Sequence, residues 1–196
     1  DGGLACWGYD GFGEVSGPNG STGSYTAVSA GYYHTCALRT DGRIACWGND
    51  DQGQVSGPNG STDNYTVVSA AMHTCALRTD GRLACWGYDF DGSVSGPNGS
   101  TAAYTAVSSS GADTCALRSN GRLTCWGYDG NRQVSGPNGS TGSYTAVAAG
   151  GLVTCALRTN GRLACWGHEL NGEVSGPSAS TGSYKAVGAS DFSTCA

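Results

Sequence analysis

The segment Cys36-Ala-Leu-Arg-Thr-Asp-Gly-Arg-Ile-Ala-Cys-Trp-Gly48 contains the motif that repeats through this 196-residue chain. Its last dipeptide, Trp-Gly, occurs five times with spacings of 40, 39, 40 and 40 residues. The five tryptophans are Trp7, Trp47, Trp86, Trp126 and Trp166. A fixed period of this length is the signature of a repeat architecture. Five similar units therefore fill the chain without a linker.

Each unit contains short apolar or β-branched runs separated by turn sequences such as Asp-Gly and Ser-Gly-Pro-Asn-Gly. This pattern predicts four antiparallel strands per unit, at 25–29, 35–39, 43–47 and 54–56 in the unit around Cys36. Such a sheet cannot bury both faces alone, and stacking around an axis gives an all-β, five-bladed β-propeller. We expect one domain over residues 1–196, with repeats approximately at 7–46, 47–85, 86–125, 126–165 and 166–196 plus 1–6.

The ten cysteines predict disulfide bonds. Four pairs are ten residues apart, namely Cys36 and Cys46, Cys75 and Cys85, Cys115 and Cys125, and Cys155 and Cys165. A three-residue Thr-Asp-Gly loop would set the two cysteines of a pair directly opposite each other. Cys6 and Cys195 stand in complementary halves of the same hairpin, so we expect a Cys6–Cys195 bond that closes the ring from both termini. The spacing of the pairs does not suit zinc ligands, and we expect neither a metal site nor a cofactor.

Composition narrows the class of protein. Disulfides predict an oxidising compartment and hence a secreted, extracellular protein. The formal net charge of −5 and the sequence pI near 4.9 argue against nucleic acid as a partner. We expect no membrane span, because no stretch approaches the roughly 20 consecutive apolar residues that one needs. The opening Asp1-Gly2-Gly3 lacks the layout of a signal peptide, so the sequence is interpreted as a mature, processed product.

The run at 36–48, followed by Gly53-Gln54-Val55, resembles the repeat of the regulator of chromosome condensation family. The resemblance extends along the whole chain. It implies a β-propeller with four strands per blade and usually seven blades. The family includes chromatin-bound exchange factors, plant receptor ectodomains of the crinkly type and a secreted bacterial inhibitor of β-lactamase. This chain differs in blade number, in its cysteine pairs and in its acidity, so the resemblance predicts the fold better than the function.

The five copies differ from one another on one predicted face only. We call it the variable face; it carries the loop between the first and second strands and the loop after the third strand. Diversity confined to one face, rich in Tyr, Phe, His and Asp, predicts a ligand-binding surface; the alternative is loop drift without constraint. The candidate residues are Tyr9, Phe12, Tyr32, Tyr33, His34, Met72, His73, Tyr88, Phe90, Asp113, Tyr128, His168, Asp191 and Phe192.

The opposite face, which we call the hairpin face, repeats almost unchanged. It carries the Thr-Asp-Gly turns with their flanking arginine pairs, which we interpret as solvated structural residues with local acidic partners. It also carries the Gly-Pro-Asn-Gly-Ser-Thr segments. Possible N-glycosylation sites are Asn19, Asn59, Asn64, Asn98 and Asn138. The tryptophans repeat with the blade and are interpreted as packing residues.

Catalysis is not predicted. The three histidines, His34, His73 and His168, occupy non-equivalent places, and no nucleophile motif accompanies them. The predicted function is therefore that of a non-catalytic secreted recognition protein, not an enzyme, which binds a protein through the variable face as a monomer. Two alternatives remain open: a multivalent lectin with about five similar sites, and a structural or self-assembling extracellular protein.

Overall fold

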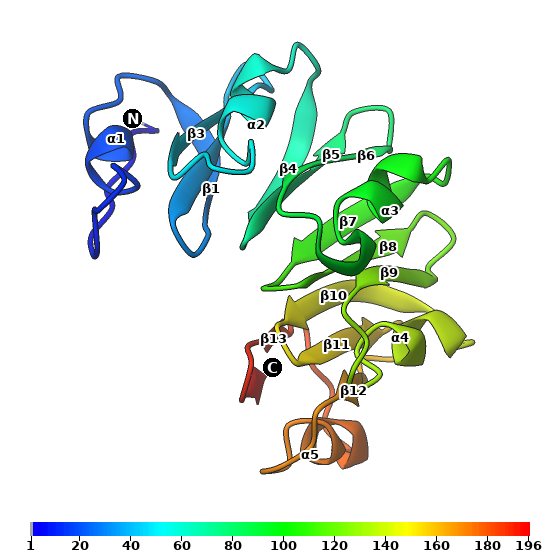
Figure 1. The fold of residues 1–196 in the computed structure, drawn as a ribbon. Helices are drawn as coiled ribbons and strands as arrows, with labels where there is room; N and C mark the ends of the chain where they lie inside the picture. Colours follow the sequence, from blue (N-terminus) through cyan, green and yellow to red (C-terminus); the bar gives the residue numbers. More distant parts are fainter. Residues whose placement is uncertain (1) are drawn as a thin grey trace.

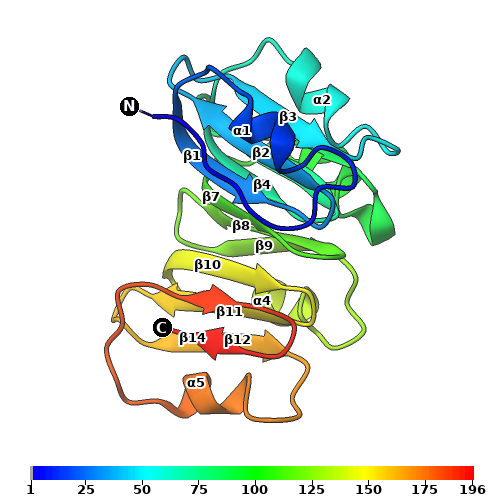
Figure 2. The same ribbon diagram turned by 90° about the vertical axis from the view of Figure 1, so that its left-hand side faces the viewer.

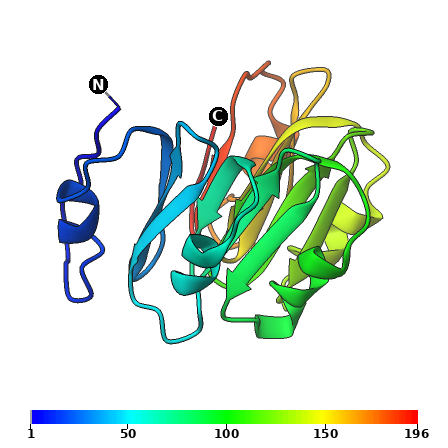
Figure 3. The ribbon, with the colours of Figure 1, turned by 90° about the horizontal axis from the view of Figure 1, so that it is seen from above.

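The computed structural model describes residues 2–196, which form a series of antiparallel sheets fanned side by side (Figures 1 and 3). Four sheets have three strands and the last has two. The first two blades are β1 (Tyr25–Ala30), β2 (His34–Arg39), β3 (Ile44–Gly48) and β4 (Tyr65–Ala70), β5 (His73–Arg78), β6 (Leu83–Gly87). The third and fourth are β7 (Tyr104–Ser109), β8 (Asp113–Arg118), β9 (Leu123–Gly127) and β10 (Tyr144–Gly150), β11 (Val153–Arg158), β12 (Leu163–Gly167). The partial fifth is β13 (Gly188–Ala189) and β14 (Thr194–Cys195).

The hairpin register follows the prediction from the cysteine spacing. Cys36 lies opposite Cys46, and Leu38 lies opposite Ile44. The turn contains Gly42 at a φ of +83°, a left-handed conformation that glycine adopts without steric cost. The three-residue loop is therefore confirmed, and the same register recurs in the other complete blades.

Four of the five predicted disulfides are present, and they join the four cysteine pairs that are ten residues apart. The predicted Cys6–Cys195 bond is wrong for this structure, since both thiols are free. The two ends of the chain lie apart, so residues 2–196 form an open arc (Figures 1 and 2). The four complete blades and the partial fifth blade therefore leave the ring open.

The predicted fourth strand is also wrong, because a short helix occupies its place in every unit. These helices are α1 (Ser16–Asn19), α2 (Ser56–Gly60), α3 (Ser95–Gly99), α4 (Ser135–Gly139) and α5 (Ser175–Ala179), with a 3-10 turn η1 (Phe90–Gly92) before α3. Each contains a proline, which lacks the N–H that a ladder bond needs.

A side chain, in place of a fourth strand, makes hydrogen bonds to the backbone at the free edge of each third strand. In the first blade, Asn59 accepts a hydrogen bond from the Cys46 N–H at 2.7 Å and donates its amide nitrogen to the Cys46 carbonyl at 2.9 Å. Asn19, Asn98 and Asn138 make the same pair of bonds to Cys6, Cys85 and Cys125. The amide nitrogen that a glycan would modify is thus already engaged at four of the five predicted acceptor sites. Whether any of them carries a glycan stays a prediction.

The helices α2, α3 and α4 each also join two neighbouring blades. In α2, Gly57 lies against the Trp86 ring of the next blade, and an added Cβ would come within 2.4 Å of Trp86 Cδ1. The same ring meets Tyr65 edge-on at 5.8 Å between centroids. The predicted packing role of the tryptophans is confirmed where a helix precedes them. Trp7, which no helix of residues 2–196 covers, is 85% exposed.

Buried polar contacts also join neighbouring blades near the start of their second strands. His34 Nε2 lies 2.8 Å from Thr74 Oγ1, and that hydroxyl donates to the Gln54 carbonyl at 3.0 Å. Because the hydroxyl proton goes to Gln54, the imidazole must be the donor to Thr74. His73 and Thr114 repeat the contact between the next two blades.

Candidate ligand-binding face

The loops of the variable face do gather at one end of the blades. His34, the first residue of β2, pairs with Gly48, the last residue of β3, so the loops before and after these strands are neighbours. Among residues 2–196, eleven large hydrophobic side chains are exposed, and nine of them lie on this face. They are Tyr9, Phe12, Tyr32, Tyr33, Met72, Tyr88, Phe90, Leu170 and Phe192. Exposed apolar side chains gathered on one face mark an interaction surface.

Several of these aromatic rings touch across loops. Phe12 meets Tyr33 edge-on, with 5.8 Å between centroids. Phe90 stacks on Tyr88 at 5.9 Å and reaches Tyr128 of the next unit at 6.1 Å. Because the rings support one another, part of the ordering cost of binding is met before a partner arrives.

A cavity of about 270 Å³ opens on the variable face between the first and second blades. Five of the predicted residues line it, namely Tyr32, Tyr33, His34, Met72 and Tyr88. Five further lining residues were not singled out from the sequence: Asn49, Asp51, Gln52, Gln54 and Ala71. Most of these belong to the loop after the third strand, whose variability between copies was the available signal.

Three of the candidate residues are buried and hold the fold together. His34 is 2% exposed, and His73 and Asp113 are fully buried at the first position of their strands. Burial lowers the pKa of both His34 and His73 to about 4, so both imidazoles are neutral at physiological pH. Tyr128, His168 and Asp191 are half-buried, and Tyr9 and Phe192 are exposed away from the cavity.

A carboxylate in each loop after the third strand has a structural task. Asp50 Oδ1 accepts the N–H groups of Val55 and Ser56, both at 2.8 Å, and so caps the start of α2. Asp10, Asp89, Asp129 and Glu169 cap the other helices in the same way. The backbone N–H groups of Ser16 and Val15 hold the pKa of Asp10 below its usual range. These acids are therefore poor candidates for ligand contacts.

The buried carboxyl group of Asp113 should make the folded protein less stable as the pH rises. Burial, aided by Asp191, raises its pKa from 3.8 to about 7, so the folded protein holds this carboxyl protonated where the unfolded chain has released the proton. Its stabilising contribution is complete below about pH 4 and is lost as the pH rises to about 7. Asp113→Asn should therefore raise the free energy of unfolding by on the order of 2 kcal/mol at pH 8 and change it little at pH 4. Urea unfolding at both pH values checks this; equal effects would contradict it.

Acidic and basic residues separate between the two faces. The variable face and the strand ends beneath it hold eleven acids and one base: Asp10, Glu14, Asp50, Asp51, Asp89, Asp91, Asp113, Asp129, Glu169, Glu173 and Asp191, with Arg132. The hairpin face holds eight arginines and Lys185 against three acids, Asp41, Asp63 and Asp80. The formal net charge of −5 does not reveal this separation, because it sums over both faces.

These features define an all-β repeat protein of the propeller type. Three segments, residues 25–54, 73–93 and 144–173, match the regulator of chromosome condensation (RCC1) repeat. These segments carry repeats of this family, and the predicted resemblance is thereby confirmed. No curated protein sequence matches it.

Solved structures with the same fold include two plant receptor ectodomains. The ectodomain of the Physcomitrella patens receptor kinase CR4 is 25% identical with a TM-score of 0.73, over 96% of this chain and 51% of that one. The CRINKLY WD40 ectodomain of the Arabidopsis thaliana receptor kinase ACR4 is 22% identical with a TM-score of 0.71, over 99% and 69%. Yeast RCC1 (Prp20), solved with Kap60 bound, is 17% identical with a TM-score of 0.64, over 87% and 53%. This chain spans about half the length of the CR4 ectodomain.

Proposed function

We propose that this protein is a non-catalytic extracellular recognition protein that binds a protein partner through the variable face. The observation that carries the proposal is the gathering of nine of the eleven exposed large hydrophobic side chains on that face. Aromatic anchors of this kind supply most of the binding energy in protein interfaces.

Further support comes from the fold and the disulfides. The four buried disulfides and the receptor-ectodomain neighbours point to an extracellular location. Within residues 2–196, none of the helices has the length and apolar character needed to cross a bilayer. The yeast neighbour was solved with a protein, Kap60, bound to it. A protein of this fold thus occurs in complex with another protein, which supports the proposal.

The cavity between the first and second blades is the proposed centre of the interface. Tyr32 and Tyr33 are each about half exposed, and Met72 and Tyr88 add further apolar surface around it. The amide side chains of Gln54 and Asn49 are held by their own hydrogen bond at 2.6 Å, which fixes one wall. A partner side chain that enters this cavity would meet a largely preformed site.

Affinity capture with matched variants tests the proposal. The wild-type protein and Tyr33→Ser would be immobilised and exposed to extracellular fluid of the source organism, and the Kd of each captured protein would then be measured by interferometry. We expect about tenfold weaker binding for Tyr33→Ser, because an exposed aromatic anchor is lost. Val28→Ser is the control. Val28 is about as exposed as Tyr33, but it lies within the strand β1 and not in a loop of the variable face. A partner that tolerates Tyr33→Ser but not Val28→Ser would contradict the proposal.

A further inference from the structure

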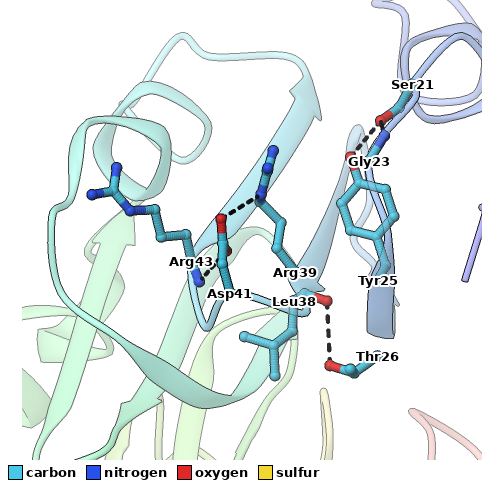
Figure 4. A network of polar contacts seen from close by, with 8 residues as sticks. All are labelled: Ser21, Gly23, Tyr25, Thr26, Leu38, Arg39, Asp41 and Arg43. Atoms are coloured by element: carbon cyan, nitrogen blue, oxygen red, sulfur yellow. Dashed lines mark hydrogen bonds and ion pairs between the residues drawn. The ribbon is translucent and has the colours of Figure 1, made fainter.

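Each complete blade presents two arginines side by side at its hairpin. In the first blade, the Arg39 N–H donates to the Arg43 carbonyl at 2.8 Å, which places the two residues opposite each other across the turn. Figure 4 shows both arginines with Asp41, which contacts each of them. The same backbone bond recurs in the other three complete blades. The four pairs are Arg39 and Arg43, Arg78 and Arg82, Arg118 and Arg122, and Arg158 and Arg162.

Acidic residues compensate these arginines in the first two blades. Asp41 Oδ2 lies 3.2 Å from Arg39 Nε. Arg78 contacts Asp63 at 3.1 Å and Asp80 at 3.6 Å. The predicted local pairing is therefore confirmed for these two hairpins.

The third and fourth blades have no such compensation. Asn120 and Asn160 replace the turn aspartate, and Ala102 and Gly142 stand where the second blade has Asp63. Within residues 2–196, none of the four arginines of these blades forms an ion pair: Arg118, Arg122, Arg158 and Arg162. The Nε of Arg118 is buried, and no hydrogen-bond acceptor within residues 2–196 meets it. Two adjacent blades thus carry four uncompensated guanidinium groups.

Two equivalent hollows show what the change of turn residue does. Each has a volume of about 390 Å³. The hollow on the first blade holds Asp41 between Arg39 and Arg43. The hollow on the fourth blade has Asn160 between Arg158 and Arg162, with Trp166 and Ser178 in its wall. The fourth-blade hollow therefore pairs two cations with neutral hydrogen-bonding groups and an aromatic ring, and contains no carboxylate.

We propose that the hairpin face of the third and fourth blades binds an anionic polysaccharide whose sugars carry carboxylate or sulfate groups. Paired guanidinium groups match these oxyanions in shape and charge. Amide, hydroxyl and aromatic side chains in the fourth-blade hollow suit the hydroxyls and ring faces of a sugar. Two similar sites on adjacent blades fit a polymer with a repeating charge, and binding at both raises the overall affinity.

The turn itself supplies the test variant. Asn120 Oδ1 and Asn160 Oδ1 each accept the N–H of the second arginine at 3.1 Å, as Asp41 does at 3.0 Å in the first blade. Asn120→Asp with Asn160→Asp therefore keeps the turn bond and adds only the compensating charge. The control is Arg39→Gln with Arg43→Gln, which removes two charges from the compensated first blade.

Calorimetric titration with a galacturonic acid decamer and with a dextran sulfate of similar length, at low salt, would measure the binding. We expect the wild type to bind at least one of these probes, and the double aspartate variant to bind it about tenfold more weakly. The control variant should lose less than about twofold. No binding of either probe, an equal loss in the control, or equally tight binding of a DNA of matched charge would overturn the proposal. Tyr33→Ser should leave this binding unchanged, so the result is independent of the protein-binding function proposed above.

Discussion

Trp126→Ala should lower the free energy of unfolding by about 3 kcal/mol. Trp126 lies between Gly96 of the preceding helix and Tyr104 of its own blade, with ring centroids 5.8 Å apart for the aromatic pair. Truncation to alanine removes both contacts and leaves a gap that the glycine cannot fill. Because a repeat protein depends on its junctions, loss of one junction weakens the whole array. Urea unfolding followed by intrinsic fluorescence of the remaining tryptophans checks the value.

Trp7→Ala is the matched control for this prediction. Trp7 holds the same place in the repeat but is 85% exposed, and its replacement should change stability by less than about 0.5 kcal/mol. A loss at Trp7 as large as the loss at Trp126 would show that another part of the protein covers Trp7, and would contradict the open arc described above.

The second large effect is expected from the disulfide of the second blade. Cys75→Ala with Cys85→Ala should lower the free energy of unfolding by about 3 kcal/mol, mainly because the unfolded chain gains the freedom of a released loop. The bond spans ten residues, and both cysteines are almost fully buried, at 0% and 3% exposed. Chemical unfolding of the oxidised protein, with and without the two substitutions, measures the difference.

Cys6→Ser with Cys195→Ser provides the comparison for the disulfide prediction. Both thiols are free in the structure, so this double variant should unfold at the same denaturant concentration as the wild type. Thiol titration of the folded wild type should find these two groups. If neither thiol reacts and the double variant is destabilised by several kcal/mol, the two ends are bonded to each other and the ring is closed.

The elements that local interactions control were predictable from the sequence. The spacing of Cys36 and Cys46 together with the Asp-Gly turn set the register of the hairpin, because its two strands are joined by only a few residues. The repeat of about 40 residues likewise predicted one sheet per unit. The grouping of the variable loops at one end of the blades followed from the alternating direction of the strands.

The fourth strand and the closed ring were decided by tertiary contacts that the repeat does not reveal. Gly-Pro-Asn-Gly segments are compatible with a turn after a strand, and the choice of a helix depends on Asn59 reaching the edge of β3 and Gly57 meeting Trp86. Closure depends on the rotation between blades, which the packing of all junctions sets together. A hairpin pattern contains no information on that angle.

Within the candidate site, the comparison of the five repeats was enough to identify the loops that vary, but the residues that lie together depend on the folding of the whole chain. His34, His73 and Asp113 belong to variable positions but are buried. The two histidines contact a threonine of the next blade, whereas Asp113 accepts a hydrogen bond from Ser110 of its own blade. Conversely, Asn49 and Asp51 join Tyr33 and Met72 around one cavity although the residues come from two blades. Side-chain direction and blade packing together produce this arrangement, and both depend on contacts between residues about 40 positions apart.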